Sequence, residues 1–462
     1  MEETVITDTL IIGAGISGLA SAHFLKKSGA DVRIIEKKPR AGGSIQSEHK
    51  DGFLVDHGPN SALETTPLLK EIFEDTGIID EMIYANDSAK NRYILKNGKL
   101  QALPMSPVKF MKTKLFSFPA KMRLFKEPFI KPYAGDDDES LADFVKRRLG
   151  KEFLFYAIDP FVAGIFAGTP ENLSTKSAFP KLHQLEQEYG SLIRGALLGA
   201  RKRKKSKEKS KQSAKMFSFV NGMETMIKAL ADEFKDVLHL NCIIKSIEKQ
   251  SGKWQVEVDE NGEKKIFQAK SVLFTIPAHA YENIPFAREL QDQFDKFYYP
   301  PVTMVFYGYR KNPSKAPLDG FGYLIPRKEE KNILGTIWSS VIFPGRAPEG
   351  GAAFTTFVGG SRQPENAQKT EEEIDELVRS DFKSIMGIDA EPDVKVIHKW
   401  NKAIPQYKVN HYRIIEEIEK FEYENAGIFI AGNFRGGISV ADCVKQSKEN
   451  EEKIGEFLNT EK

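Results

Sequence analysis

The sequence has little cysteine. Only Cys242 and Cys443 occur in 462 residues, too far apart for a CxxC pair, so neither a dithiol redox centre nor a disulfide framework is predicted. Long apolar runs are missing too, since no segment reaches the roughly 18 apolar residues that span a bilayer. Neither sign of charge is in excess, because 67 basic residues face 65 acidic ones, and this balance gives no case for a nucleic-acid partner.

Motifs of metal sites and of secretion are absent as well. The sequence contains no HExxH and no histidine and acidic residues clustered at metal-binding spacing, so no metal is predicted. The chain begins with MEET and passes directly into an apolar run, which leaves no space for a cleavable signal peptide. We therefore expect a cytoplasmic protein. Its length of 462 residues predicts two or three domains.

A nucleotide-binding pattern stands at the start of the chain. The stretch DTLIIGAGISGLASAHFLKKSG, residues 8–29, reads as a buried strand, a glycine turn and an amphipathic helix. Gly13, Gly15 and Gly18 form GxGxxG, whose glycines permit a tight turn, a close pyrophosphate and close helix packing. A second short strand ends in Glu36, about 20 residues on, where an acid binds the ribose hydroxyls. NAD and FAD both fit this pattern.

The next residues distinguish the two cofactors. KKPRAGGS contains an RxGG motif at Arg40, and a predicted hairpin then leads into a tight turn at Gly58 and Pro59. In this order the motifs resemble the superfamily of flavin-containing amine oxidases and protoporphyrinogen oxidases, in which RxGG binds FAD. The stretch 426–454 also resembles the C-terminal flavin motif of that superfamily, a strand, a glycine turn and a helix. The resemblance implies FAD.

The same resemblance implies the cofactor-binding residues. They are Gly13, Ala14, Gly15, Ile16, Ser17, Gly18, Glu36, Lys37, Arg40, Gly42, Gly43, Gly58, Pro59, Asn60, Ser61, Ile244, Trp400, Gly432, Gly437, Ile438, Ser439 and Val440.

The fold predicted on this basis is α/β, with a discontinuous Rossmann-like FAD-binding domain, an α+β substrate domain and a mainly helical insert. The predicted ranges are 1–80, 216–280 and 422–462 for the FAD-binding domain, 81–102 and 281–421 for the substrate domain, and 103–215 for the insert.

The electron acceptor of the flavin is inferred from the other redox motifs that the sequence lacks. A second GxGxxG is missing, since DGFGYL near Gly320 lacks the third glycine, so a nicotinamide reductant is not indicated. Without a dithiol either, dioxygen is the simplest acceptor, and an oxidase is the leading class. The alternative of a non-catalytic flavoprotein stays open, and anaerobic mixing with substrate separates the two.

The substrate is predicted from a longer resemblance. Residues 157–202, together with 92–104, 320–344 and 398–407, resemble the protoporphyrinogen oxidase family. The resemblance implies oxidation of protoporphyrinogen IX in haem synthesis, with six electrons passing through FAD to dioxygen as peroxide, and handover of product to the next enzyme of that synthesis. Coproporphyrinogen III oxidase and an FAD amine oxidase or desaturase stay open as alternatives. The residues implied at the substrate are Arg92 for a propionate, Gly164 for its carbonyl near the reacting carbon, and Phe321 and Leu324 around the macrocycle.

Two basic stretches bear on membrane contact. Residues 107–133 carry five phenylalanines and seven basic residues against one acid, which favours contact with an anionic lipid surface. A helix pair with a basic outer face is the alternative. Residues 201–215 carry nine basic residues against one acid and read as a solvated loop that adds to lipid attraction. The prediction is peripheral attachment to the inner face of the cell membrane.

Overall fold

The nucleotide-binding side of the protein is built on a seven-stranded sheet with the strand order β10-β2-β1-β13-β12-β11, and β19 pairs with β13. The computed structural model describes residues 4–135, 137–203 and 214–460. In it β19, β13, β1, β2 and β10 run parallel, whereas β11, β12 and β13 form an antiparallel meander. The strands are β1 (Thr4–Ile12), β2 (Val32–Ile35), β10 (Leu238–His239), β11 (Cys242–Gln250), β12 (Lys253–Glu260), β13 (Glu263–Phe274) and β19 (Ile428–Ile430).

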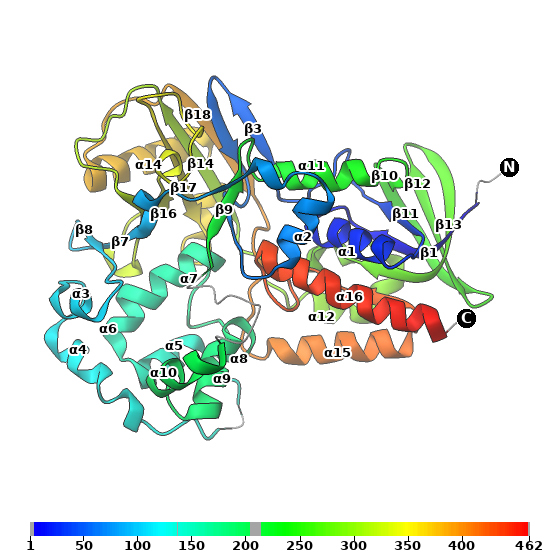
Figure 1. Ribbon diagram of the computed structural model, residues 1–462, viewed down its shortest axis with the longest axis horizontal. Helices are drawn as coiled ribbons and strands as arrows, with labels where there is room; N and C mark the ends of the chain where they lie inside the picture. The colour runs from blue at the N-terminus through cyan, green and yellow to red at the C-terminus, as the bar shows by residue number, and fades with distance from the viewer. Residues whose placement is uncertain (1–3, 136, 204–213, 461–462) are drawn as a thin grey trace.

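Helices cover this sheet on both faces, which explains the unbroken apolar run at the end of β1. On one face α1 (Ile16–Lys27) packs with α11 (Glu224–Glu233) and α16 (Val440–Thr460). Figure 1 shows α1 and α16 side by side, and Ser447 of α16 donates a hydrogen bond to the carbonyl of Ser17 at 3.0 Å. The first and last segments of the chain therefore share one core, as the predicted α/β fold requires.

The second sheet is also seven-stranded, with the order β18-β14-β17-β16-β15-β7-β8. It is antiparallel except for the parallel pair β15 and β7. Helix α14 (Glu371–Met386) buries Ile374, Val378 and Phe382 in the core of this sheet. The strands are β7 (Asn91–Lys96), β8 (Lys99–Ala102), β14 (Val302–Tyr309), β15 (Gly320–Leu324), β16 (Ile333–Ile337), β17 (Ala352–Gly359) and β18 (Val394–Trp400).

A group of helices forms the third part and lies at the lower left in Figure 1. Its members surround a core that includes Leu115, Phe144, Val162 and Leu173. A single π-helical segment, Leu154–Ile158, joins two of the helices. The helices are α3 (Pro107–Lys112), α4 (Phe118–Leu124), α5 (Leu141–Arg148), α6 (Lys151–Phe153), α7 (Asp159–Phe166), α8 (Thr175–Ala178), α9 (Pro180–Tyr189) and α10 (Leu192–Arg203).

Two smaller sheets connect these parts. The hairpin of β3 (Ser47–Lys50) and β4 (Phe53–Asp56) packs Phe53 against Phe306 of the second large sheet. Strand β9 (Met216–Phe219) pairs with both β5 (Ala62–Leu63) and β6 (Met82–Tyr84). The chain segments before and after the helical insert are therefore joined by backbone hydrogen bonds.

The boundary predicted at residue 421 falls inside α15 (His411–Glu424). Ile418 and Phe421 of this helix pack with Phe294 of α12 (Gln291–Phe294) and Phe434 in the core of the nucleotide-binding sheet. Helices α12 and α15 therefore pack in the core of the nucleotide-binding sheet, although the predicted boundary assigned α12 and most of α15 to the substrate domain. Of the predicted basic run 201–215, residues 204–213 lie outside the described residues. Within the described ranges no helix combines the length and apolarity needed to cross a bilayer.

Candidate functional site

The GxGxxG loop has the shape that its glycines predict. Gly13 has a φ of +105°, and a Cβ on Gly18 would collide with the carbonyl oxygen of Gly13. Gly15 is the N-cap of α1 and brings no side chain to the helix end, so the first N–H groups of the helix face the loop. Oε2 of Glu36 accepts a hydrogen bond from the N–H of Ala14 at 2.9 Å. The carboxylate is thus fixed beside the N-terminus of α1.

The RxGG loop lies against this first loop. Gly42 donates its N–H to the carbonyl of Ala14 at 2.7 Å, and a Cβ on Gly43 would lie 3.6 Å from the Cα of Gly15. The guanidinium of Arg40 donates to the carbonyls of Ala41 at 2.9 Å and Gly43 at 2.7 Å. Arg40 therefore shapes the loop to which it belongs, and neighbouring Lys37 is exposed.

The turn at Gly58 continues the same surface. A Cβ on Gly58 would collide with the carbonyl oxygen of Ser44, next to the RxGG motif, while Pro59, Asn60 and Ser61 follow half-buried. Trp400 of β18 donates its indole N–H to the carbonyl of His57 at 3.0 Å. This bond ties the second sheet to the turn and accounts for the position of Trp400.

The C-terminal loop completes the cradle. Gly432 and Gly437 have φ values of +141° and +134°, which favour glycine. The hydroxyl of Tyr407 donates to the carbonyl of Asn433 at 2.8 Å and accepts from the N–H of Gly437 at 2.8 Å. The ring of Tyr407 stacks on His411 at 4.1 Å, and burial raises the pKa of its hydroxyl. The sequence analysis missed Tyr407, although it ends the segment 398–407.

The remaining residues implied at the cofactor lie around this loop. Ser439 accepts the N–H of Asp442 at 3.2 Å and donates its hydroxyl to the Asp442 carboxylate at 2.6 Å, and α16 begins at Val440. Ile438 packs against the core of the helical insert. The C-terminal loop therefore contacts the insert through Ile438. Ile244 lies apart from this loop and is half-buried on β11 of the nucleotide-binding sheet.

The residues implied at the substrate lie on the second sheet and on α7. The guanidinium carbon of Arg92 lies 5.6 Å from the ring centre of Phe321. Arg92 is exposed to solvent, yet desolvation by the surrounding protein lowers its pKa. Both observations fit a side chain that lies partly against the protein and is charged and available to an anion.

Gly164 marks a close approach of α7 to β15. A Cβ on Gly164 would lie 2.7 Å from Cδ2 of Leu324, so a side chain at 164 would displace that leucine. Phe321 and Leu324 share β15 but contribute to different apolar clusters, with Gly322 at a φ of +137° between them. The two residues implied around one macrocycle therefore border two neighbouring apolar regions.

Further apolar side chains surround Gly164 and were missed by the sequence analysis. Phe161 and Ile165 of α7 are 43% and 40% exposed. Phe357 of β17 is half-buried and packs beside Ala163. A strand pattern alone does not reveal Phe357, because neighbouring positions of β17 are fully buried on both faces. Phe161 and Ile165 lie four positions apart on one face of α7 and offer an exposed apolar surface there.

The loops fit a dinucleotide with a flavin. The GxGxxG and RxGG loops meet at the N-terminus of α1, and the fixed carboxylate of Glu36 stands beside them, which matches a pyrophosphate and a ribose. Among the residues that the structure describes, no group of three or more histidine, cysteine and acidic side chains is placed to hold a metal ion.

Comparison with known proteins identifies that cofactor. A family model described as flavin containing amine oxidoreductase matches residues 16–449. Mitochondrial protoporphyrinogen oxidase of Nicotiana tabacum is 33% identical over 465 residues, covering 94% of this chain and 92% of that protein. Coproporphyrinogen III oxidase of Bacillus subtilis (strain 168) is 28% identical and covers 95% of this chain and 96% of that protein.

A solved structure supports the fold independently. A crystal structure of an Exiguobacterium sp. 255-15 protein matches with a TM-score of 0.81 at 24% identity, covering 97% of this chain and 98% of that chain. Cyclohexylamine oxidase from Brevibacterium oxydans IH-35A matches with a TM-score of 0.68 at 17% identity, covering 98% and 99%. The cofactor of the protein is FAD, and the protein is an FAD-dependent oxidoreductase. The chain belongs to the flavin-containing amine oxidoreductase family, alongside the protoporphyrinogen and coproporphyrinogen oxidases that it resembles over nearly its whole length.

Proposed function

We propose that the protein oxidises protoporphyrinogen IX to protoporphyrin IX, a step of haem synthesis. The observation that carries the proposal is the 33% identity to a protoporphyrinogen oxidase across 94% of the chain. Six electrons and six hydrogens leave the porphyrinogen in three cycles, each reducing one dioxygen to hydrogen peroxide through FAD. The flavin supplies the redox chemistry, and the protein orients the two rings and excludes water.

The residues of the cleft have distinct roles in this proposal. Arg92 binds a propionate, because a guanidinium presents a planar fork that matches both carboxylate oxygens. Gly164 offers its carbonyl near the reacting carbon, and its missing side chain leaves room for Leu324 beside it. Leu324 and Phe321 contact the macrocycle from the second sheet. The cofactor-binding residues implied by the family resemblance hold FAD.

We propose the corresponding division of the chain into domains. The FAD-binding domain takes 1–80, 216–280 and 422–462, the substrate domain 81–102 and 281–421, and the insert 103–215. Although α12 and most of α15 fall in the range 281–421, both helices pack in the core of the nucleotide-binding sheet, so the boundaries of the substrate domain there move inward to exclude them.

A second candidate substrate is coproporphyrinogen III, favoured by the 28% identity to a coproporphyrinogen III oxidase over 95% of the chain. The two substrates differ in two vinyl groups against two propionates, so the second needs more cations at the cleft. The test compares kcat/KM for both porphyrinogens, with cyclohexylamine as a control for an amine oxidase. The proposal requires the protoporphyrinogen value to be the highest; a higher value for coproporphyrinogen III or for the amine would refute it.

We propose further that the helical insert docks on an anionic membrane surface. The exposed side of 107–133 is apolar and basic: Phe118, Phe125 and Phe129 are 67%, 60% and 80% exposed. Six basic residues are exposed with them, Lys109, Lys112, Lys114, Arg123, Lys126 and Lys131. Apolar insertion and attraction to anionic lipid act together on such a surface.

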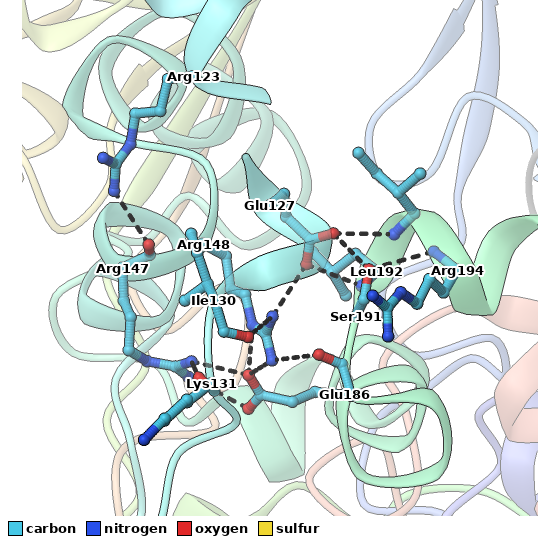
Figure 2. Close-up of polar contacts among 12 residues, drawn as sticks. Arg123, Glu127, Ile130, Lys131, Arg147, Arg148, Glu186, Ser191, Leu192 and Arg194 are labelled. Atoms are coloured by element: carbon cyan, nitrogen blue, oxygen red, sulfur yellow. Dashed lines mark hydrogen bonds and ion pairs between the residues drawn. The ribbon is translucent and has the colours of Figure 1, made fainter. Parts of the chain in front are cut away.

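The acid of this segment is removed from the surface. Glu127 is fully buried and accepts hydrogen bonds from the N–H groups of Leu192 at 2.9 Å and Ile193 at 3.2 Å. It also pairs with the buried Arg148 at 3.1 Å, which binds Glu186 as well. Figure 2 shows Arg148 between the two carboxylates. This network anchors the turn after α4 to the rest of the insert. The exposed side of residues 107–133 is therefore left without an acidic residue of its own.

Cosedimentation with vesicles tests this docking. Vesicles of phosphatidylcholine with phosphatidylglycerol should bind the protein, and Phe125→Ser with Phe129→Ser should weaken binding at least tenfold. Tyr423→Ser is the control, since Tyr423 is 89% exposed on α15 away from the segment. Equal binding of wild type and double variant would contradict the docking. A membrane-attached, cytoplasmic enzyme could then hand its product to the next enzyme of haem synthesis at that surface.

A further inference from the structure

A buried arginine outside the predicted site carries an unused hydrogen-bond donor. Arg346 is 2% exposed, and its Nη2 donates to the hydroxyl of Ser218 at 2.7 Å and to the carbonyl of Phe219 at 3.1 Å. Nη1 is buried and has no hydrogen-bond partner among the described residues. A buried donor without a partner is costly, and in a native protein it calls for a ligand or a water.

The charge of Arg346 is only partly balanced. The nearest carboxylate oxygen is Oδ2 of Asp56, 3.8 Å from Nε. Oδ1 of Asp56 is occupied by the hydroxyl of Ser47 at 2.6 Å and the N–H of Met223 at 2.9 Å. Burial raises the pKa of Asp56 and lowers that of Arg346, but a guanidinium stays protonated in proteins. The surroundings of Nη1 are therefore positive.

Arg346 lines a small cavity between the two sides of the site. Asn60 and Ser61, from the turn implied at the flavin, form one wall, and Phe321 and Ile337 of the second sheet form another. The cavity has room for about one water. A propionate arm is too large for this space, whereas dioxygen exceeds a water by one heavy atom.

We propose that Arg346 stabilises the negative charge that forms on dioxygen as FAD is reoxidised. The inference rests on the proposed function, because Asn60 and Ser61 belong to the turn implied at the flavin and Phe321 to the residues implied at the macrocycle. The reduced flavin anion, one proton and dioxygen give oxidised flavin and hydrogen peroxide. The first electron makes superoxide, and the free Nη1–H and the positive charge stabilise it before the second electron and the protons arrive. A fixed cation in a water-poor site stabilises such charge strongly.

Reoxidation without porphyrinogen tests the inference. Enzyme reduced with dithionite is mixed with dioxygen in a stopped-flow instrument, and the return of flavin absorbance gives a second-order rate constant. Arg346→Met should lower this constant on the order of 100-fold, as the loss of an oxyanion donor does. Arg346→Lys should retain most of it, and the exposed Arg413→Met should leave it unchanged. The midpoint potential of bound FAD should fall in Arg346→Met and stay unchanged in Arg413→Met.

A second variant keeps the inference testable if Arg346→Met does not fold. Asp56→Asn removes the nearest negative charge and should raise the reoxidation rate constant, even if Arg346→Met fails to bind FAD. Unchanged constants in the folded variants would overturn the inference and leave a water site. A raised KM for porphyrinogen with normal reoxidation would also overturn it and make Arg346 a carboxylate anchor. If wild type reoxidises normally after dithionite but porphyrinogen never reduces it, the proposed function fails instead.

Discussion

Arg92→Ala removes the cation that the proposed function places opposite a propionate. In the structure the guanidinium is accessible, partly desolvated and held beside the ring of Phe321 at 5.6 Å. A hydrogen bond to a charged group contributes about 1.5 to 3 kcal/mol, so kcat/KM for protoporphyrinogen IX should fall about 10- to 150-fold. The contact is made equally in ground and transition states, so the loss should appear in KM.

Steady-state kinetics at saturating dioxygen measures this loss, with FAD content recorded for each preparation. Arg92 lies on β7 of the second sheet, so FAD content should not change. Arg92→Lys should recover part of the loss, because an ammonium keeps the charge without the planar fork. Arg413→Ala is the matched surface control. A KM within about twofold of wild type for both porphyrinogens would refute the assignment of Arg92.

Three further changes test other parts of the structure. Gly18→Ala places a Cβ against a backbone carbonyl and should abolish FAD absorbance, whereas Gly455→Ala, with open space around it, should retain it. Glu127→Gln should lower the free energy of unfolding by about 3 kcal/mol in urea titration, because it leaves Arg148 partly unpaired, and the exposed Glu188→Gln should not. Burial lowers the pKa of His411 from 6.5 to about 4, so below pH 6.5 the unfolded chain binds a proton that the folded protein does not. Stability should therefore fall by about 1.36 kcal/mol per pH unit between these values as pH decreases, and His411→Phe should flatten that slope; an unchanged slope would contradict the assignment.

The sequence predicts the nucleotide-binding half well because local rules decide it. A strand, a glycine turn and a helix follow one another within residues 8–29, and the structure places β1 and α1 there. The C-terminal strand, turn and helix are equally local. Their joining in one sheet was predictable only from the family resemblance, since β19 pairs with β13 across a long stretch of chain.

The cleft is less predictable because distant side chains form it. Tyr407 becomes important only when Asn433 and Gly437 fold back onto it, and nothing in its neighbours signals this. Arg346 reads as a surface arginine after a proline and a glycine, yet it is buried against Ser218 and Phe219 of β9 and near Asp56. The acid Glu127 likewise looks like part of a charged surface, and only the tertiary fold buries it.

Anaerobic mixing of the FAD-loaded protein with protoporphyrinogen IX tests directly whether the protein is a porphyrinogen oxidase. We expect flavin absorbance to be bleached as the porphyrinogen is oxidised, and admission of dioxygen then to give three hydrogen peroxide molecules for each protoporphyrin IX. A flavin that stays oxidised with porphyrinogens but is bleached by an amine would show that the protein is an amine oxidase instead.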